Sequence, residues 1–150
     1  MRYSIKIIGV LLVIFNYSVS RAQTQNDQLI GTWIFDFNAS VFNMEEKAKA
    51  IIQKLPAVQE KLEKSYKNRQ ITFGVDGHYT LYLSDGRQTN GIWTFDSTAT
   101  RNNTIDLITS ENQIQKFIVL FISTDKLILK PQDDSNGKPM FSQWYFTKKI

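Results

Sequence analysis

The feature that most constrains this chain is a series of short segments in which apolar and polar residues alternate. The segments fill the chain after Asn68, and turn residues such as Asp76-Gly77 and Asp85-Gly86 separate them. A period of two residues is typical of β-strands with one buried face, and Asp-Gly pairs favour tight hairpin turns. The pattern predicts seven strands, over residues 71–75, 79–83, 91–95, 105–107, 114–122, 127–130 and 140–148.

A further strand is predicted near the start of the ordered chain, over Leu29 to Phe37, where Trp33, Phe35 and Phe37 share one face. Eight short strands with turns between them favour an antiparallel meander, and eight strands suffice to close a barrel. The 150 residues, 42% of them hydrophobic, are enough for one domain with its own core. We therefore predict a mainly β fold, an eight-stranded antiparallel up-and-down barrel.

The period changes to that of a helix between the first two predicted strands. Apolar residues recur three or four positions apart, which is typical of an amphipathic helix; they are Met44, Ala48, Ile51, Leu55, Val58, Leu62 and Tyr66. Pro56 interrupts this stripe and predicts two short helices or one kinked helix. Because this connection lies at one end of the barrel, we expect residues 44–67 to form a lid over its mouth, with Ile51, Leu55, Val58 and Leu62 facing the barrel.

The first 22 residues are predicted to be a secretory signal peptide. Arg2 and Lys6 precede an apolar run from Ile7 to Phe15, and Ser20 and Ala22 place small residues where a signal peptidase reads them. The run falls short of the roughly 20 apolar residues that span a bilayer, so we expect no stable membrane span. The mature domain then covers residues 23–150, with a short disordered lead over 23–28, and is secreted or periplasmic.

Charge and composition argue against a nucleic-acid partner and against disulfide bonds. Cleavage after Ala22 removes Arg2, Lys6 and Arg21 from the 18 basic residues, so that 15 face 14 acidic ones and the net charge falls from +4 to +1. A nucleic-acid partner bound through phosphate contacts is therefore not expected. The chain contains no cysteine, so no disulfide forms.

The residues offer little for catalysis, and we predict neither an enzyme nor a cofactor nor a metal site. His78 is the only histidine and directly follows a predicted turn, where an exposed side chain is the common case. Five aspartates fall in predicted turns, where their side chains bond the nearby backbone; they are Asp76, Asp85, Asp125, Asp133 and Asp134. The last two, with Asn136 and Gly137, do not have the spacing of an EF-hand loop.

The barrel interior is the candidate ligand-binding site. Under strand alternation the inward-facing side chains are Trp33, Phe35, Phe73, Tyr79, Leu81, Trp93, Ile105, Phe117, Val119, Leu129 and Trp144. An interior of this kind holds one small apolar molecule, or its rings fill the space and leave a solid core. The many large rings and the short strands favour a filled or nearly filled barrel over a roomy pocket, and the mature protein is expected to be a monomer.

Short motifs along the chain resemble those of the lipocalin superfamily. Gly31-Thr32-Trp33 matches its first-strand Gly-x-Trp, and Thr124-Asp125 matches part of its Thr-Asp-Tyr turn, with Lys126 in place of the tyrosine. The arginine that covers the motif tryptophan is missing, and Lys148 or Lys149 stands in its place. The second Gly-x-Trp, at Gly91-Ile92-Trp93, and the helical insertion are similar to those of small secreted lipocalin-like proteins of bacteria.

The resemblance implies an extracytoplasmic binder of a small hydrophobic ligand held inside the barrel. A second hypothesis is a non-enzymatic module with a filled barrel that binds a protein or a glycan through exposed aromatic residues such as Tyr82 and Tyr145. A third is an envelope-associated protein that shares the fold but carries no ligand, because fold alone does not fix function.

Overall fold

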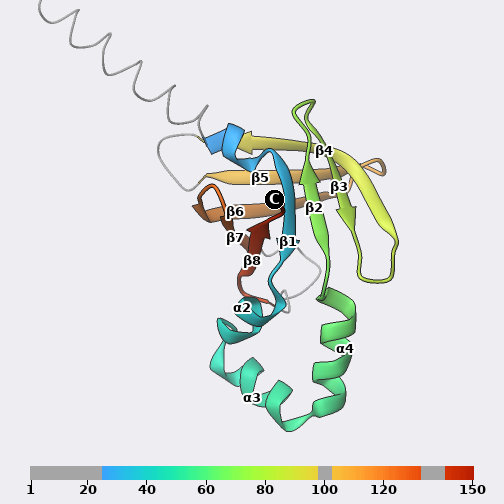
Figure 1. Ribbon diagram of the computed structural model, residues 1–150, viewed down its shortest axis with the longest axis vertical. Helices are drawn as coiled ribbons and strands as arrows, with labels where there is room; N and C mark the ends of the chain where they lie inside the picture. The colour runs from blue at the N-terminus through green and yellow to red at the C-terminus, as the bar shows by residue number, and fades with distance from the viewer. Residues whose placement is uncertain (1–24, 98–102, 133–140) are drawn as a thin grey trace, which may run out of the picture.

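A closed, all-antiparallel barrel of eight strands forms the body of the protein (Figure 1). The computed structural model describes residues 25–97, 103–132 and 141–150. Each strand pairs with the next along the chain, and the last pairs with the first. The strands are β1 (Gly31–Phe35), β2 (Gln70–Phe73), β3 (His78–Tyr82), β4 (Gln88–Asp96), β5 (Thr104–Thr109), β6 (Ile114–Ile122), β7 (Lys126–Pro131) and β8 (Trp144–Lys148). The predicted up-and-down barrel is confirmed.

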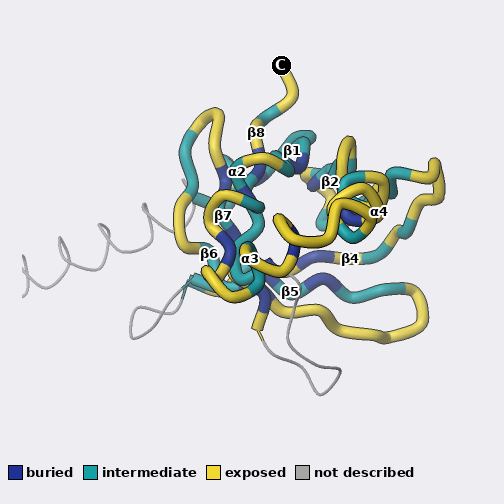
Figure 2. The backbone as a smooth tube through the Cα atoms, turned by 90° about the horizontal axis from the view of Figure 1, so that it is seen from below, coloured by how far each residue is buried: buried dark blue, intermediate teal, exposed yellow. Residues whose placement is uncertain are grey.

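Closure depends on the pairing of β1 with β8, which brings the two ends of the domain together. Trp33 lies opposite Lys148, and Phe35 lies opposite Phe146. Since directly opposed residues point to the same face, these pairs place their side chains together on the inner side of the barrel. Figure 2 views the strands from the helix end, where they form a ring.

Strand alternation places one apolar face of every strand toward a common core. Fully or almost fully buried side chains come from all eight strands, and they belong to one continuous cluster. The strand members of that cluster are Trp33, Phe35, Ile71, Phe73, Tyr79, Trp93, Ile105, Leu107, Phe117, Leu127, Leu129 and Phe146. A β-bulge between Val119 and Phe121 shifts the register of β6 against β7.

The first strand is shorter than predicted because a helix begins directly after it. The Asp36 carboxylate accepts a hydrogen bond of 2.9 Å from the Ala39 backbone N–H and so caps α2 (Phe37–Phe42). Phe37 is therefore the first residue of a helix, and the prediction that it continues the strand was wrong. The buried Ser40 hydroxyl accepts a hydrogen bond from the Tyr145 N–H, which ties α2 to β8.

The connection from β1 to β2 contains three helices at one end of the barrel (Figure 1). After α2, the chain forms α3 (Glu46–Lys54) and α4 (Pro56–Tyr66). Leu55 has φ −126° and ψ 82°, which ends α3, and Pro56 occupies the first turn of α4, where its missing N–H costs nothing. The predicted break at Pro56 is thus confirmed as two separate helices.

The buried face of these helices differs from the predicted lid face. Leu62 is buried and Val58 is half-buried, but Ile51 and Leu55 are 56% and 49% exposed, so the prediction that they face the barrel was wrong. Ile52 is buried instead. Ala48 and Ile52 lie on one face of α3, which ends at Lys54. The backbone angles of Leu55 are not helical, so α4 does not continue the turn of α3 and one apolar stripe cannot run through both helices.

A short helix at residues 25–29 lies at the barrel end opposite α2, α3 and α4 (Figure 1). Leu29 is fully buried. The prediction of a disordered lead was therefore wrong for residues 25–28; residues 23 and 24, like the predicted signal peptide, lie outside the described residues. The last strand begins at Trp144 rather than at Met140, which is also outside them. None of the helices in the described ranges has the length and apolar content of a membrane span.

Candidate functional site

The inward-facing positions predicted from alternation lie in the core or against it. Trp33, Phe35, Phe73, Tyr79, Trp93, Ile105, Phe117 and Leu129 are buried, and Leu81, Val119 and Trp144 are partly buried and pack against them. The sequence analysis missed Ile71, Leu107, Leu127 and Phe146, although each continues the alternation of its strand and that signal was sufficient to find them.

At one end of the barrel, which we call the base, Trp33 contacts Leu29 and Lys148. Trp33 is fully buried, and its indole Nε1 donates a hydrogen bond of 2.7 Å to the Leu29 carbonyl oxygen. The Lys148 ammonium lies 4.9 Å from the centroid of the Trp33 ring and donates a 2.9 Å hydrogen bond to the Gln28 carbonyl oxygen. Of the two lysines considered for this role, Lys148 is the one that covers the tryptophan.

The turn between β6 and β7 also lies at the base. The Asp125 carbonyl oxygen accepts a hydrogen bond of 2.9 Å from the backbone N–H of Lys148. The Ser123 hydroxyl contacts the Asp125 carboxylate at 2.8 Å, so this aspartate shapes its turn as predicted. The start of β1 and the Thr124-Asp125 turn therefore meet at the same end of the barrel, opposite α2, α3 and α4.

The second Gly-x-Trp segment lies in β4, where Gly91 leaves space for a neighbouring ring and the Trp93 indole is hydrogen-bonded. A Cβ at Gly91 would lie 2.7 Å from Tyr79 Cε1, so only glycine lets the Tyr79 ring lie across β4. The Trp93 indole donates to the Gly74 carbonyl oxygen at 3.1 Å and packs edge-on against Phe73 at 5.2 Å between ring centroids. Burial raises the pKa of the Tyr79 hydroxyl, which keeps it neutral at physiological pH.

The opposite end of the barrel, which we call the mouth, carries a cluster of five aromatic rings. Phe35 is central to this mouth cluster, with ring centroids 5.5 to 5.8 Å from those of its neighbours. The neighbours are Tyr66, Phe141, Trp144 and Phe146. Most of these pairs meet edge to face, the geometry that aromatic quadrupoles favour.

Besides Phe146, two further members of the mouth cluster were not predicted as site residues. Tyr66 is the last apolar residue of α4. Its contact with Phe35 of β1 depends on how α4 is placed against the barrel, which the apolar pattern of the helix does not specify. Phe141 is fully buried, whereas a strand starting at Met140 would place it on the outer face together with Tyr145. Because β8 begins only at Trp144, residue 141 precedes the strand and does not follow its alternation.

Trp144 differs from the other two tryptophans in the state of its indole nitrogen. Its Nε1 is buried and has no hydrogen-bond partner among the described residues. The ring lies in the mouth cluster, 5.4 Å from the centroid of Phe117 and 6.2 Å from that of Tyr66. Within the part of the chain that the structure describes, it is the one buried side-chain nitrogen or oxygen without a hydrogen-bond partner.

A half-buried arginine lies beside the mouth cluster. The Arg69 guanidinium lies over the Tyr66 ring, with Cζ 4.0 Å from its centroid, and Arg69 Nε donates to the Ser65 carbonyl oxygen at 2.7 Å. Burial lowers the pKa of Arg69 more than nearby Tyr66 and Asp85 raise it, and the group stays charged at any physiological pH. Arg69 also lines a recess of about 430 Å³ between α4 and the β3–β4 hairpin.

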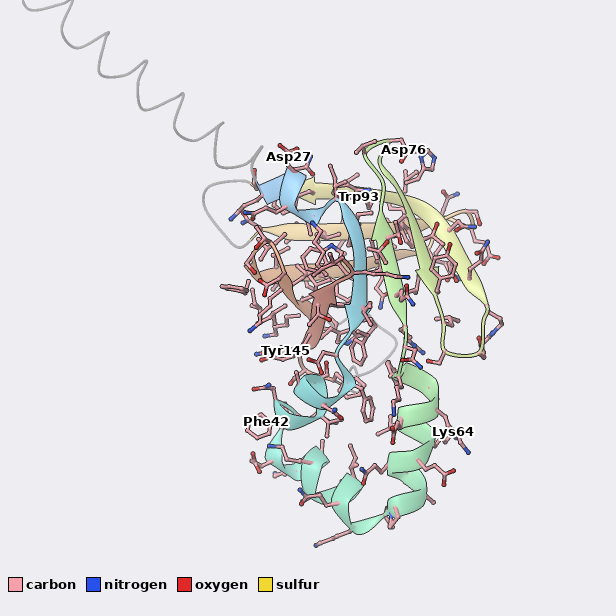
Figure 3. All side chains as sticks on the ribbon, in the orientation of Figure 1. Asp27, Phe42, Lys64, Asp76, Trp93 and Tyr145 are labelled. Carbon is pink, nitrogen blue, oxygen red and sulfur yellow. The ribbon has the colours of Figure 1, made fainter. Side chains whose placement is uncertain are left out.

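The only histidine of the chain lies on the surface, away from the mouth cluster. His78 is exposed beside the Asp76-Gly77 turn, as predicted, and its Nδ1 lies 3.2 Å from an Asp76 carboxylate oxygen. Asp76 and Asp85 accept hydrogen bonds from the backbone N–H groups of His78 and Arg87, so both act in their turns as predicted. Asp133, Asp134, Asn136 and Gly137 lie outside the described residues. Figure 3 shows Asp76 at the far end of the barrel from Lys64.

The fold and the site together define a small closed β-barrel with a lysine-covered tryptophan at its base and an aromatic mouth beside three helices. Comparison with known proteins found no match: no protein-family model matches the sequence, no curated protein is significantly similar to it, and no solved structure is significantly similar to the fold.

Proposed function

We propose that the domain is a lipocalin-like binding protein that takes up a small hydrophobic molecule through the mouth of its barrel. The observation that carries this proposal is the mouth cluster, where aromatic rings from β1, α4 and β8 meet at an end of the barrel that α2, α3 and α4 flank. Leu81 and Trp144 face inward there and keep exposed surface, so an apolar molecule that covers them gains hydrophobic free energy.

The arrangement at the base supports the lipocalin-like assignment. The tryptophan of the Gly-x-Trp motif lies under a cationic side chain from β8, and the Thr124-Asp125 turn lies next to it. Lys148 performs the covering role that the resemblance assigns to an arginine. The up-and-down order of all eight strands agrees with the same assignment.

We further propose that residues 1–22 direct export and are removed, which places the mature protein in the periplasm or outside the cell. The basic residues Arg2 and Lys6, the apolar run and the small residues Ser20 and Ala22 support this. N-terminal sequencing of the protein recovered from the extracytoplasmic fraction of bacteria that produce the full chain tests it. A mature protein starting at Gln23 is expected, and recovery of the whole chain from the cytoplasm contradicts it.

The binding function is tested on that exported mature protein. Native mass spectrometry is expected to detect a co-purified small molecule, and N-phenylnaphthylamine, an apolar fluorescent probe, is expected to bind in a one-to-one ratio and to quench tryptophan emission. Light scattering after size exclusion is expected to give the mass of a monomer. A protein that carries no molecule and binds no apolar probe overturns the proposed function.

A second candidate function has its own observation on the outer face. Ile92 lies opposite Ile108, and Ile108 lies opposite Ile114, so three isoleucines form a row across β4, β5 and β6. Ile92 and Ile114 are 46% and 50% exposed. Such a row favours an interaction module with a filled barrel, and Tyr82 is exposed as that hypothesis requires, whereas Tyr145 is half-buried. Ile92→Asn would then abolish partner binding and leave probe binding intact.

A further inference from the structure

The three tryptophans of the barrel provide an internal comparison of hydrogen bonding. Trp33 Nε1 donates to the Leu29 carbonyl oxygen and Trp93 Nε1 donates to the Gly74 carbonyl oxygen. Trp144 Nε1 is also buried but has no acceptor in the described part of the chain. A buried donor without a partner is costly, so native proteins rarely keep one without a reason.

The described residues around Trp144 supply no acceptor for its Nε1–H. Its ring contacts are with Phe35, Tyr66, Phe117 and Phe146. A ring face accepts an N–H only weakly and replaces little of the lost hydrogen bond. The Trp144 Nε1–H is therefore available to an acceptor from outside the described residues.

A positively charged side chain is connected to Trp144 through the ring of Tyr66. The Phe35 backbone N–H donates to the Arg69 carbonyl oxygen, so the two residues lie opposite each other. Because Phe35 faces inward, the Arg69 side chain also leaves the backbone on the inner face of the barrel. Its guanidinium covers the Tyr66 ring, which in turn contacts the Trp144 ring. No carboxylate of the described residues lies within ion-pair distance of Arg69.

The recess that Arg69 lines has the same sign of charge. Its basic residues are Lys61, Lys64, Arg69 and Arg87, and its acidic ones are Glu60 and Asp85. Lys64 pairs with Glu60 at 2.7 Å, and Arg87 pairs with Asp85 at 2.8 Å. Lys61 and Arg69 are left in excess, so an anion is attracted to this side of the mouth.

On the basis of the proposed function, we infer that the ligand is an amphipathic carboxylate. Its apolar chain covers the aromatic rings of the mouth cluster, one carboxylate oxygen accepts the Trp144 Nε1–H, and Arg69 balances the charge. A neutral hydrocarbon would leave the indole donor unpaired, and a cation would be repelled by Arg69 and Lys61. A carboxylate satisfies both requirements, because hydrogen bonds and ion pairs to it are charge-assisted.

The first test needs no substitution. In the ¹⁵N-labelled wild-type protein the three tryptophans give three indole N–H resonances. Dodecanoate is expected to move the Trp144 resonance downfield and to slow its exchange with water, while the Trp33 and Trp93 resonances, already hydrogen-bonded, move little. A Trp144 resonance that stays unchanged while dodecanoate binds overturns the role of this donor.

The second test uses two probes with the same alkyl chain, dodecanoate and its methyl ester, and a third apolar probe without oxygen, N-phenylnaphthylamine. Trp144→Phe is expected to weaken dodecanoate about tenfold relative to N-phenylnaphthylamine, the ratio that the loss of one charge-assisted hydrogen bond produces. Arg69→Gln is expected to reduce the preference for dodecanoate over the methyl ester by a similar factor. Arg87→Gln, which removes the same charge from an ion-paired position in the same recess, is the control and is expected to keep the wild-type preference.

The outcomes separate this inference from the proposed function. If N-phenylnaphthylamine binds but dodecanoate binds no better than its methyl ester, the carboxylate is overturned and the binding function stands. If Arg87→Gln changes the preference as much as Arg69→Gln, the preference comes from the overall positive charge of the recess, and the assignment to Arg69 is overturned. If none of the three probes binds the wild-type protein, both proposals are overturned.

Discussion

A Cβ atom at Gly31 would lie 2.9 Å from Cε of Lys148, so a side chain here would push the end of Lys148 away from its position over Trp33. The φ angle of Gly31 is 122°, in a region that other residues rarely adopt. The glycine of the Gly-x-Trp motif is therefore required both by its backbone and by its neighbour.

Gly31→Ala is expected to destabilise the fold by about 2 kcal/mol or more, because backbone strain and the contact with Lys148 add together. Gly86→Ala is the matched control, since Gly86 also has a positive φ, 85°, but nothing lies within 4 Å of its added Cβ. Urea unfolding of both variants measures the difference. Equal losses of stability would show that the Lys148 contact contributes nothing.

Lys148→Met keeps most of the aliphatic stem that covers Trp33 and removes the ammonium. The cation–π contact and the hydrogen bond to the Gln28 carbonyl are then lost, at an expected cost of about 1–2 kcal/mol. Lys149→Met removes the same charge from the next residue, whose ammonium donates a hydrogen bond of 3.4 Å to the Gln70 side chain. Thermal unfolding should show a clearly lower Tm for the first variant and a nearly unchanged one for the second.

The tryptophans should differ in the stability that their indole nitrogens provide. Trp33→Ala is expected to cost roughly 3 to 5 kcal/mol, because Trp33 is fully buried in the core. Trp33→Phe also leaves the Leu29 carbonyl without its donor, whereas Trp144→Phe removes a donor that has no partner. The cost of Trp33→Phe should exceed that of Trp144→Phe by about 1 kcal/mol or more. The reverse order in chemical unfolding would mean that Trp144 Nε1 has an acceptor.

The corrected helix face is tested by two adjacent isoleucines. Ile52→Ala removes a buried side chain and is expected to cost roughly 2 kcal/mol or more. Ile51→Ala, at an exposed position, should stay within about 0.5 kcal/mol of the wild type. If Ile51→Ala is the more harmful change, the originally predicted lid face is the correct one.

The Asp76 turn predicts a specific pH dependence. The hydrogen bond from the His78 N–H holds the pKa of the Asp76 carboxyl below its ordinary value of 3.8. A folded-state pKa below the unfolded one means that the carboxylate stabilises the fold at pH values above 3.8 and that this contribution is lost as the pH falls through the folded-state pKa. The stability difference between wild type and Asp76→Asn should therefore shrink as the pH falls into the acid range. A carbon-detected NMR titration giving an Asp76 midpoint at or above 3.8 contradicts this.

Local sequence signals predicted the strands well because their causes are local. Alternation determines which side chains of a strand share a face, and the Asp-Gly pairs determine where the chain reverses, so the inward positions from Trp33 to Trp144 could be predicted. The errors fall where a neighbouring element intervenes. The Asp36 cap converts Phe37 to helix, and the extended Leu55 resets the helical phase so that Ile52 and not Ile51 is buried.

The sequence by itself determined the number of strands, their inner faces, the break at Pro56 and the tryptophans that fill the core, since each depends on residues a few positions apart. Tertiary structure alone decided that Lys148 covers Trp33, that Phe141 joins the mouth cluster, and that Arg69, Tyr66 and Trp144 form one continuous set of contacts. These contacts join residues far apart in the chain, and they exist only because β8 returns to pair with β1 and close the barrel.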